Sequence, residues 1–209
     1  MHSPWILASR NRGKLRELRA LFATHGIGVI DLLDAGISED KVAEDAVEAF
    51  ATFEENALAK ARHFSALLPG RIVVADDSGL SVDGLDGAPG VRSKRWSGRS
   101  DLEGTALDAA NNALLLARLS GVGSRTARFV CAAAWSHNGT DVVVRGEVEG
   151  HIIDEPRGGY GFGYDPYVFV DDLGKTMAEA TVAEKGLASH RGRALTSLLA
   201  ELRARRLMP

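Results

Sequence analysis

Two carboxylates, a hydroxyl and a glycine follow a short apolar run in the first half of the chain. Residues 72–75 are apolar and predict a buried strand, and Asp76, Asp77, Ser78 and Gly79 come directly after it. Ligands of open α/β sheets bind beyond the carboxyl ends of strands, where acids can hold a metal ion. The sequence therefore predicts metal-dependent chemistry at this point.

The segment after these acids contains turn residues and then cations. Residues 84–90 are too rich in glycine and proline for a helix or a strand. The eight residues from position 92 to position 99 then supply four basic side chains, Arg92, Lys94, Arg95 and Arg99. Groups that hold a cation and groups that hold an anion occur in one stretch, which indicates a metal–phosphate substrate.

A second candidate anion site lies near the N-terminus. Residues 5–8 predict a short strand, residues 9–14 a polar loop with a glycine, and the leucines that follow an amphipathic helix. A helix that begins after such a loop can receive an anion at its N-terminus. The spacing is not that of a Walker A loop, so a basic helix cap is an equal alternative.

The loop at residues 156–166 interleaves four glycines with three aromatic residues after Arg157. Glycine loosens the backbone, so this loop is a poor core element. One interpretation is a long turn whose rings pack on the sheet. The other is a backbone that approaches a flat ligand while aromatic rings cover its faces.

The remaining elements follow from periodicity and from capping patterns. In chain order we expect a weak strand at 27–30, an irregular acidic segment at 31–51, a helix capped by Thr52 with Glu55 reaching back, a helix at 101–120, an antiparallel hairpin of 126–136 with 140–149, a strand at 166–170, a short helical or irregular segment at 178–185, and a last helix capped by Ser189. Asn56 and Lys60 share one side of their helix, facing either solvent or a cleft. His190 and Arg191 are cations in a first helical turn, which the helix dipole disfavours; this indicates either a ligand role or chance.

The composition is that of an ordinary globular protein of 209 residues with a net charge of −3, which gives no support for broad nucleic-acid binding. The single cysteine, Cys131, excludes an internal disulfide and lies in an apolar run, so we expect a small buried side chain rather than a nucleophile. No signal peptide is visible, and no apolar run approaches the ~20 residues of a membrane span. We therefore expect a cytoplasmic protein without membrane or nucleic-acid polymer partners.

Four segments together resemble the signature blocks of the inosine triphosphate pyrophosphatase family, which acts on non-canonical purine nucleotides. They are Ser9-Arg10-Asn11-Arg12-Gly13-Lys14, the stretch from Thr52 to Ala61, the stretch from Ala75 to Gly98, and Gly161-Phe162-Gly163-Tyr164-Asp165-Pro166 with Glu184-Lys185 and Ser189-His190-Arg191. The blocks occur in the family's order and span nearly the whole chain.

This resemblance implies an α/β fold with an elongated central mixed β-sheet flanked by helices, and two lobes with the active site in the cleft between them. Residues 1–209 would form a single two-lobed nucleoside triphosphate pyrophosphatase domain, as a homodimer. The implied activity is magnesium-dependent hydrolysis of ITP, dITP and XTP to the monophosphate and pyrophosphate, which cleanses the nucleotide pool. The alternatives are a non-catalytic nucleotide sensor and a pyrophosphatase for another modified nucleotide.

The resemblance also implies roles for individual residues. Lys14 and Asp77 would be catalytic, and Asp77 and Glu48 would bind Mg²⁺. Lys185, His190 and Arg191 would donate toward the 6-oxo group of the purine, while Phe162 and Tyr164 stack on the base or line its pocket. The full set of implied substrate-binding residues is Ser9, Arg10, Asn11, Arg12, Gly13, Lys14, Ser78, Arg95, Phe162, Gly163, Tyr164, Asp165, Lys185, His190 and Arg191. Arg10 replaces a usual glycine, and either adds a phosphate contact or points outward.

Overall fold

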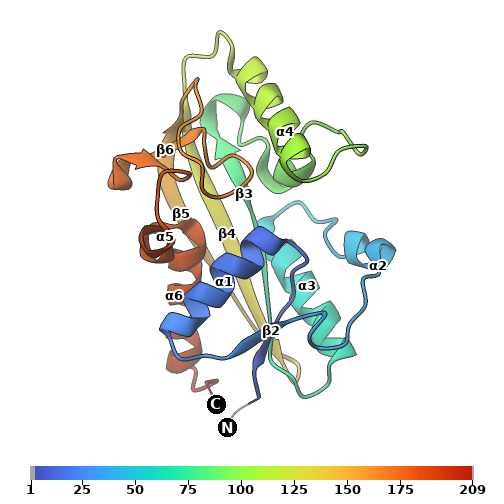
Figure 1. The fold of residues 1–209 in the computed structure, drawn as a ribbon. Helices are drawn as coiled ribbons and strands as arrows, with labels where there is room; N and C mark the ends of the chain where they lie inside the picture. Colours follow the sequence, from blue (N-terminus) through green and yellow to red (C-terminus); the bar gives the residue numbers. More distant parts are fainter. Residues whose placement is uncertain (1–2, 209) are drawn as a thin grey trace. The chain divides into compact units, whose positions relative to one another are not determined.

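The computed structural model describes residues 3–208, apart from the side chains of Val182 and Leu187. Its strands form one seven-stranded sheet in the order β2-β1-β3-β4-β5-β6-β7. β1 pairs in parallel with β2 and β3, whereas β6 pairs antiparallel with β5 and β7. The expected mixed sheet flanked by helices is confirmed (Figure 1).

The helices and strands have the following bounds: β1 Trp5–Leu7, α1 Arg12–Thr24, β2 Val29–Asp31, α2 Lys41–Ala46, α3 Phe53–Leu67, β3 Val73–Val82, α4 Gly104–Leu119, β4 Thr126–His137, β5 Thr140–Ile152, β6 Val168–Val170, β7 Lys175–Thr176, α5 Val182–Ala188 and α6 His190–Ala204. Three short 3₁₀ helices in the described part of the chain are η1 Asp83–Leu85, η2 Gly90–Arg95 and η3 Asp171–Leu173. The predicted hairpin is present as β4 and β5.

The chain divides into two compact units. Unit 1 comprises residues 1–77, 131–146 and 191–209, and unit 2 comprises residues 78–130 and 147–190. The expectation of a single two-lobed domain stays a prediction.

In unit 1, α1 and α6 cover one face of the strands (Figure 1). Leu18 and Phe22 of α1 pack with Leu195 and Leu199 of α6 in a core that also contains Trp5. The buried residues of α3 lie outside this cluster, which agrees with a position over the other face.

In unit 2, α4 supplies Leu115 and Leu119 to a second core, which includes Leu80 from β3 and Phe129 from β4. Tyr164 from the glycine-rich loop also belongs to this core. The glycine-rich loop is therefore anchored to the core of unit 2 by Tyr164.

Two expectations about local structure are wrong. The strand predicted at residues 72–75 extends as β3 to Val82, so Asp76 and Asp77 lie within a strand rather than after it. The acidic segment 31–51 contains the helix α2, capped by Asp40, whose side chain accepts from Ala43 N. None of the residues of α2 is buried, so no apolar stripe marked it in the sequence.

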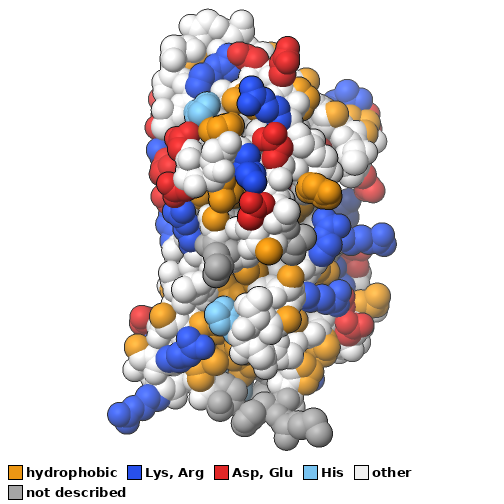
Figure 2. Space-filling model, turned by 60° about the vertical axis from the view of Figure 1, so that its left-hand side comes forward, with side chains coloured by type: hydrophobic (Ala, Val, Ile, Leu, Met, Phe, Trp, Pro, Cys, Tyr) orange, Lys and Arg blue, Asp and Glu red, His pale blue; other side chains and the backbone are white. Residues whose placement is uncertain are grey.

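No helix within the described residues is long and apolar enough to cross a lipid bilayer. On the face drawn in Figure 2, acidic and basic side chains of the described residues lie interspersed. This mixture accords with the small net charge of the sequence. The expected lack of a nucleic-acid polymer partner stays a prediction.

Candidate active site

Asp76 is a buried carboxylate surrounded by cations. Its side chain is 1% exposed, and its Oδ2 lies 3.1 Å from Lys14 Nζ and 3.3 Å from Arg191 Nε. Burial alone would raise the pKa of Asp76, but the charges of Lys14, Arg191 and Lys60 lower it well below the usual range. Asp76 is therefore ionised and holds two cations in place.

Lys14 is positioned by the first turn of α1. Asn11 caps this helix, and its Oδ1 accepts from Gly13 N at 2.8 Å and from Lys14 N at 3.1 Å. Ser9 Oγ in turn accepts from Asn11 N at 3.3 Å. The polar loop predicted as an anion site thus forms a capped helix N-terminus, which places Lys14 over Asp76.

Asp77 points to the opposite face of β3, because successive side chains of a strand alternate. Its Oδ2 accepts from Asn56 Nδ2 of α3 at 3.0 Å, whereas Asp76 meets α1 and α6. Burial raises the pKa of Asp77, although Lys14 and Lys60 act against this. The two adjacent acids therefore occupy different environments, one paired directly with cations and one suited to proton transfer or metal binding.

Lys60 joins Glu48 to the acidic strand. It is buried, donates from Nζ to the Asp76 carbonyl oxygen at 3.0 Å and forms an ion pair with Glu48. Burial would lower the pKa of Lys60, but Glu48, Asp76 and Asp77 raise it. The negative charge of Glu48 also contributes to the raised pKa of Asp77, so these two carboxylates share one region.

Asp77 and Glu48 are the carboxylates in this region that could hold a metal ion. Among the described residues no group of three or more His, Cys, Asp or Glu side chains could by itself hold a metal ion. Mg²⁺ is usually bound by only one or two carboxylates, with substrate phosphates and water completing its shell. A pair of carboxylates such as Asp77 and Glu48 fits that pattern.

Arg10 has an internal role. Its guanidinium makes hydrogen bonds to the Glu44 carboxylate, the shortest at 2.8 Å, and to the carbonyl oxygens of Ile37 and Ser38. It thereby fastens the loop before α1 to the segment that carries α2. The implied phosphate contact of Arg10 stays a prediction.

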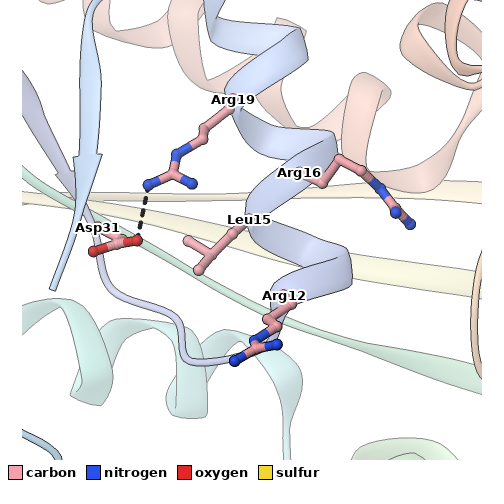
Figure 3. A pocket seen from close by; sticks show the side chains of 5 residues that line it. All are labelled: Arg12, Leu15, Arg16, Arg19 and Asp31. Atoms are coloured by element: carbon pink, nitrogen blue, oxygen red, sulfur yellow. Dashed lines mark hydrogen bonds and ion pairs between the residues drawn. The ribbon is translucent and has the colours of Figure 1, made fainter. Parts of the chain in front are cut away.

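Arg12 lies in a surface hollow of about 460 Å³ that is also lined by Arg16, Arg19, Leu15 and Asp31 (Figure 3). Arg19 is turned toward Asp31, with 2.8 Å between Nη2 and Oδ2, while Arg16 points to the other side of the helix. These guanidinium groups do not converge on one point. Arg12 therefore stands as an exposed cation at the start of α1.

In unit 2, the basic segment η2 packs closely against β3. Ser93 Oγ accepts from Leu80 N at 2.9 Å and donates to Gly90 O at 2.6 Å. A Cβ on Gly79 would lie 2.3 Å from Ser93 Oγ, so only glycine permits this approach. The half-buried Ser78 precedes that contact, and Arg95 is exposed at the end of η2.

The glycine-rich loop closes over a buried ion pair. Lys185 Nζ lies 2.7 Å from Asp165 Oδ2, and Asp165 also accepts from Phe162 N at 3.2 Å. Gly161 has a φ of +93°, and a Cβ there would lie 2.0 Å from Asp165 Oδ2. The backbone conformation therefore favours glycine at this position, and a side chain there would displace the Asp165–Lys185 pair.

The aromatic residues of this loop differ in accessibility. Tyr164 is a core residue whose hydroxyl donates to Ser93 O at 2.8 Å, and burial raises its pKa. Phe162 is half-buried. His190 is buried and stacks on Phe129, with ring centroids 5.0 Å apart. Phe162 therefore offers a more accessible ring than Tyr164.

Arg191 belongs to unit 1 and is 4% exposed. Besides Asp76, it forms an ion pair with Glu17 of α1. Burial would lower the pKa of Arg191, but these two carboxylates raise it above its usual range. The unfavourable cation in the first turn of α6 is therefore compensated by acids of its own chain.

Cys131 is fully buried, as predicted. Burial raises the pKa of its thiol to about 12. Since the thiolate is the reactive form, this cysteine is not a nucleophile near neutral pH.

Three polar residues of α4 were not singled out from the sequence. Asp108 and Asn112 both contact Gly163, and Asn111 contacts residues 93–97. Adjacent asparagines inside a helix are a usable signal, because asparagine is a poor former of helix interiors.

The model of the Ham1 family matches residues 5–201. The chain belongs to the Ham1 family. It is 48% identical over 200 residues to a dITP/XTP pyrophosphatase of Burkholderia pseudomallei, covering 94% of this chain and 92% of that protein. It is 51% identical over 205 residues to a dITP/XTP pyrophosphatase of Mycolicibacterium paratuberculosis, covering 96% of each.

Solved structures of Ham1 proteins have a similar fold. The Staphylococcus aureus Ham1 protein matches with a TM-score of 0.78 and 35% identity, covering 97% of this chain and 100% of that one. A dITP/XTP pyrophosphatase from Mycobacterium abscessus matches with a TM-score of 0.70 and 45% identity, covering 94% of this chain and 99% of that one.

Proposed function

We propose that this Ham1 protein hydrolyses non-canonical purine nucleoside triphosphates such as ITP, dITP and XTP to the monophosphate and pyrophosphate. Relatives that are 48% and 51% identical over nearly the whole chain are named dITP/XTP pyrophosphatases. The observation that carries the proposal is the pairing of two unlike acids on β3. Asp76 pairs with Lys14 and Arg191, while Asp77 beside it accepts from Asn56 of α3.

The principal phosphate contacts fall to cations of unit 1. Lys14 lies in the first turn of α1, where the helix dipole also favours an anion. Its partner Asp76 fixes its position, so Lys14 would stabilise charge on the leaving pyrophosphate. Arg12, exposed on the same turn, would assist, while Ser9, Asn11 and Gly13 would shape the loop that presents these cations to the phosphates.

Asp77 and Glu48 would hold Mg²⁺, which when bound neutralises negative charge on the phosphates. Asp77 would also orient or deprotonate the water that attacks the α-phosphate. Burial raises the pKa of the Asp77 carboxyl above that of an exposed aspartate. The raised pKa is closer to that of an effective general base at neutral pH. Asn56 would fix the orientation of the Asp77 carboxylate through its hydrogen bond to Oδ2.

Base recognition falls to unit 2. Phe162 would stack on the purine, with Tyr164 supporting it from the core, and Lys185 would donate toward the 6-oxo group. Lys185 donates to Asp165, which fixes its direction, and an ammonium has three hydrogens to donate. Adenine presents an amino donor instead of an oxo group, so a donor facing it would lose its partner.

The remaining residues that the resemblance implies for substrate binding have secondary roles in this proposal. Ser78 and Arg95 would contact the phosphates from β3 and η2, while Gly163 and Asp165 shape the loop. His190 would support the base pocket through its stack on Phe129. We assign Arg10 and Arg191 to positioning, because carboxylates of the chain engage both of them.

The test is release of pyrophosphate from the triphosphates of inosine, xanthosine, adenosine, guanosine and uridine in the presence of Mg²⁺. We expect inosine and xanthosine triphosphates to be hydrolysed at least about tenfold more efficiently than adenosine triphosphate. Binding without pyrophosphate release would favour a nucleotide sensor. Preference for uridine triphosphate would favour a pyrophosphatase for another nucleotide.

The homodimer, the cytoplasmic location and the two-lobed cleft remain parts of this proposal. The dimer is tested by the molar mass in solution from light scattering. A mass of about twice that of the 22.3 kDa chain supports it, and the mass of one chain contradicts it.

A further inference from the structure

One face of α4 holds two loops of unit 2 by side-chain hydrogen bonds. Asp108, Asn111 and Asn112 are spaced i, i+3 and i+4, so their side chains leave the helix on the same side. Asn111 and Asn112 are buried, at 3% and 6% exposure. Buried amides in a helix interior are costly unless they are hydrogen-bonded, which points to a specific task.

Both backbone groups of Gly163 are bound by this face. Asp108 Oδ2 accepts from Gly163 N at 2.9 Å, and Asn112 Nδ2 donates to Gly163 O at 2.9 Å. Gly163 lies between Phe162 and Tyr164, two of the three aromatic residues of the loop. The position of the Phe162 ring therefore depends on two side chains of α4.

Asn111 binds the other loop in the same way. Its Oδ1 accepts from Ser97 N at 2.8 Å, and its Nδ2 donates to Lys94 O at 3.1 Å. The two loops are also joined directly, because the Tyr164 hydroxyl donates to Ser93 O at 2.8 Å. α4 is thus the common support of the basic segment and the aromatic loop.

We propose that Asp108, Asn111 and Asn112 are positioning residues, and that Asp108 and Asn112 set base discrimination by fixing Gly163. This inference rests on the proposed pyrophosphatase function and deepens it. The three residues act through the loops and not on the reacting phosphates. Loosening them moves the ring that covers the purine, while the acids of unit 1 keep their arrangement.

Two isosteric substitutions with opposite expectations test this proposal. Asn112→Asp keeps the size but replaces a donor by a carboxylate facing the Gly163 carbonyl oxygen. We expect the ratio of kcat/KM for inosine over adenosine triphosphate to fall about tenfold, through a higher KM for the inosine nucleotide. Asp108→Asn also keeps the size and retains an oxygen that can accept from Gly163 N, so the ratio should stay within about twofold of wild type.

Three further variants complete the design. Asp108→Leu removes the acceptor and should lower the ratio as Asn112→Asp does. Asn112→Ser removes the amide that donates to Gly163 O without adding a charge, and replaces Asn112→Asp in the test if that variant fails to fold. Asn138→Asp makes the same chemical change in the turn between β4 and β5, in unit 1, and should leave the ratio unchanged.

Hydrogen exchange of the Gly163 amide separates this proposal from the proposed function. Its protection should fall in Asp108→Leu and Asn112→Asp and persist in Asn138→Asp, whether or not any nucleotide is hydrolysed. If wild type releases no pyrophosphate, the proposed function fails. If Gly163 loses protection but the ratio stays within twofold, or if all nucleotides lose kcat equally, the positioning role is overturned.

Discussion

The acidic strand of unit 1 and the loops of unit 2 are stabilised by different interactions. Around Asp76 and Asp77 the contacts are between charges, with Lys14, Lys60 and Arg191 as the buried or half-buried cations. Around the loops, apart from the buried Asp165–Lys185 pair, the contacts are mostly hydrogen bonds to the backbone, together with close approaches that glycine allows.

This difference predicts two kinds of sensitivity. Removing one member of a buried charge pair leaves the other uncompensated, so substitutions in the charge cluster of unit 1 should lower the free energy of unfolding strongly. Removing one neutral hydrogen bond changes the free energy of unfolding by only about 1 kcal/mol, so single substitutions at the loop hydrogen bonds of unit 2 should cause small losses. We expect chemistry to depend on unit 1 and base choice on unit 2.

The largest expected effect is on catalysis. Asp77→Asn removes the acid that would bind the metal and activate water, while its amide can still contact Asn56. We expect pyrophosphate release to fall about 10³-fold or more, with the melting temperature little changed. Turnover within about tenfold of wild type would show that Asp77 is not the catalytic acid.

The next effect is on stability. Asp76→Asn leaves Lys14 and Arg191 without their shared counter-charge and should cost about 3–5 kcal/mol of unfolding free energy. Urea denaturation at neutral pH measures this. The control is Asp34→Asn, whose exposed pair with Arg19 should contribute less than about 1 kcal/mol. Equal losses in both variants would contradict the assigned role of Asp76.

A smaller effect is expected at Gly161 in unit 2. Gly161→Ala imposes a positive φ on alanine and crowds the Asp165–Lys185 pair, which should cost about 2 kcal/mol. Gly139→Ala has a φ of +80° but meets no atom within 4 Å, so it should cost only the backbone strain, about 1 kcal/mol. Thermal unfolding compares the two, and an equal loss would mean that crowding at Gly161 is relieved by movement.

The smallest expected effect comes from one hydroxyl. Tyr164→Phe removes the hydrogen bond to Ser93 O but keeps the ring in its core. We expect a loss of about 1–2 kcal/mol, because a buried carbonyl oxygen loses its donor. Denaturant unfolding that gives no loss would show that the Ser93 carbonyl finds another partner.

Periodicity and capping were enough to predict most elements of this fold. Thr52 caps α3 as expected, accepting from Glu55 N at 3.2 Å, and its hydroxyl donates to the Glu55 carboxylate. The exposed helix α2 could not be predicted, because it buries no side chain and therefore leaves no apolar pattern. The full length of β3 was missed because polar residues in its middle pair with helices on both faces.

The site was only partly predictable for a related reason. Sequence spacing brought Asp77, Lys14 and the glycine-rich loop to attention, but it could not show which charges meet inside the fold. Arg191 and Arg10 satisfy internal carboxylates, and these pairs join residues far apart in the chain. Adjacent asparagines inside a helix draw attention to Asn111 and Asn112, but the sequence does not show that they bind the backbone of distant loops.

Binding of inosine and adenosine triphosphates to the Asp77→Asn variant in the presence of Mg²⁺ tests the division between the two units most directly. Isothermal titration calorimetry should show that this variant, although it releases almost no pyrophosphate, still binds the inosine nucleotide at least about tenfold more tightly than the adenosine nucleotide. Equal affinity for the two nucleotides, with wild type discriminating between them, would contradict the separation of chemistry from base choice.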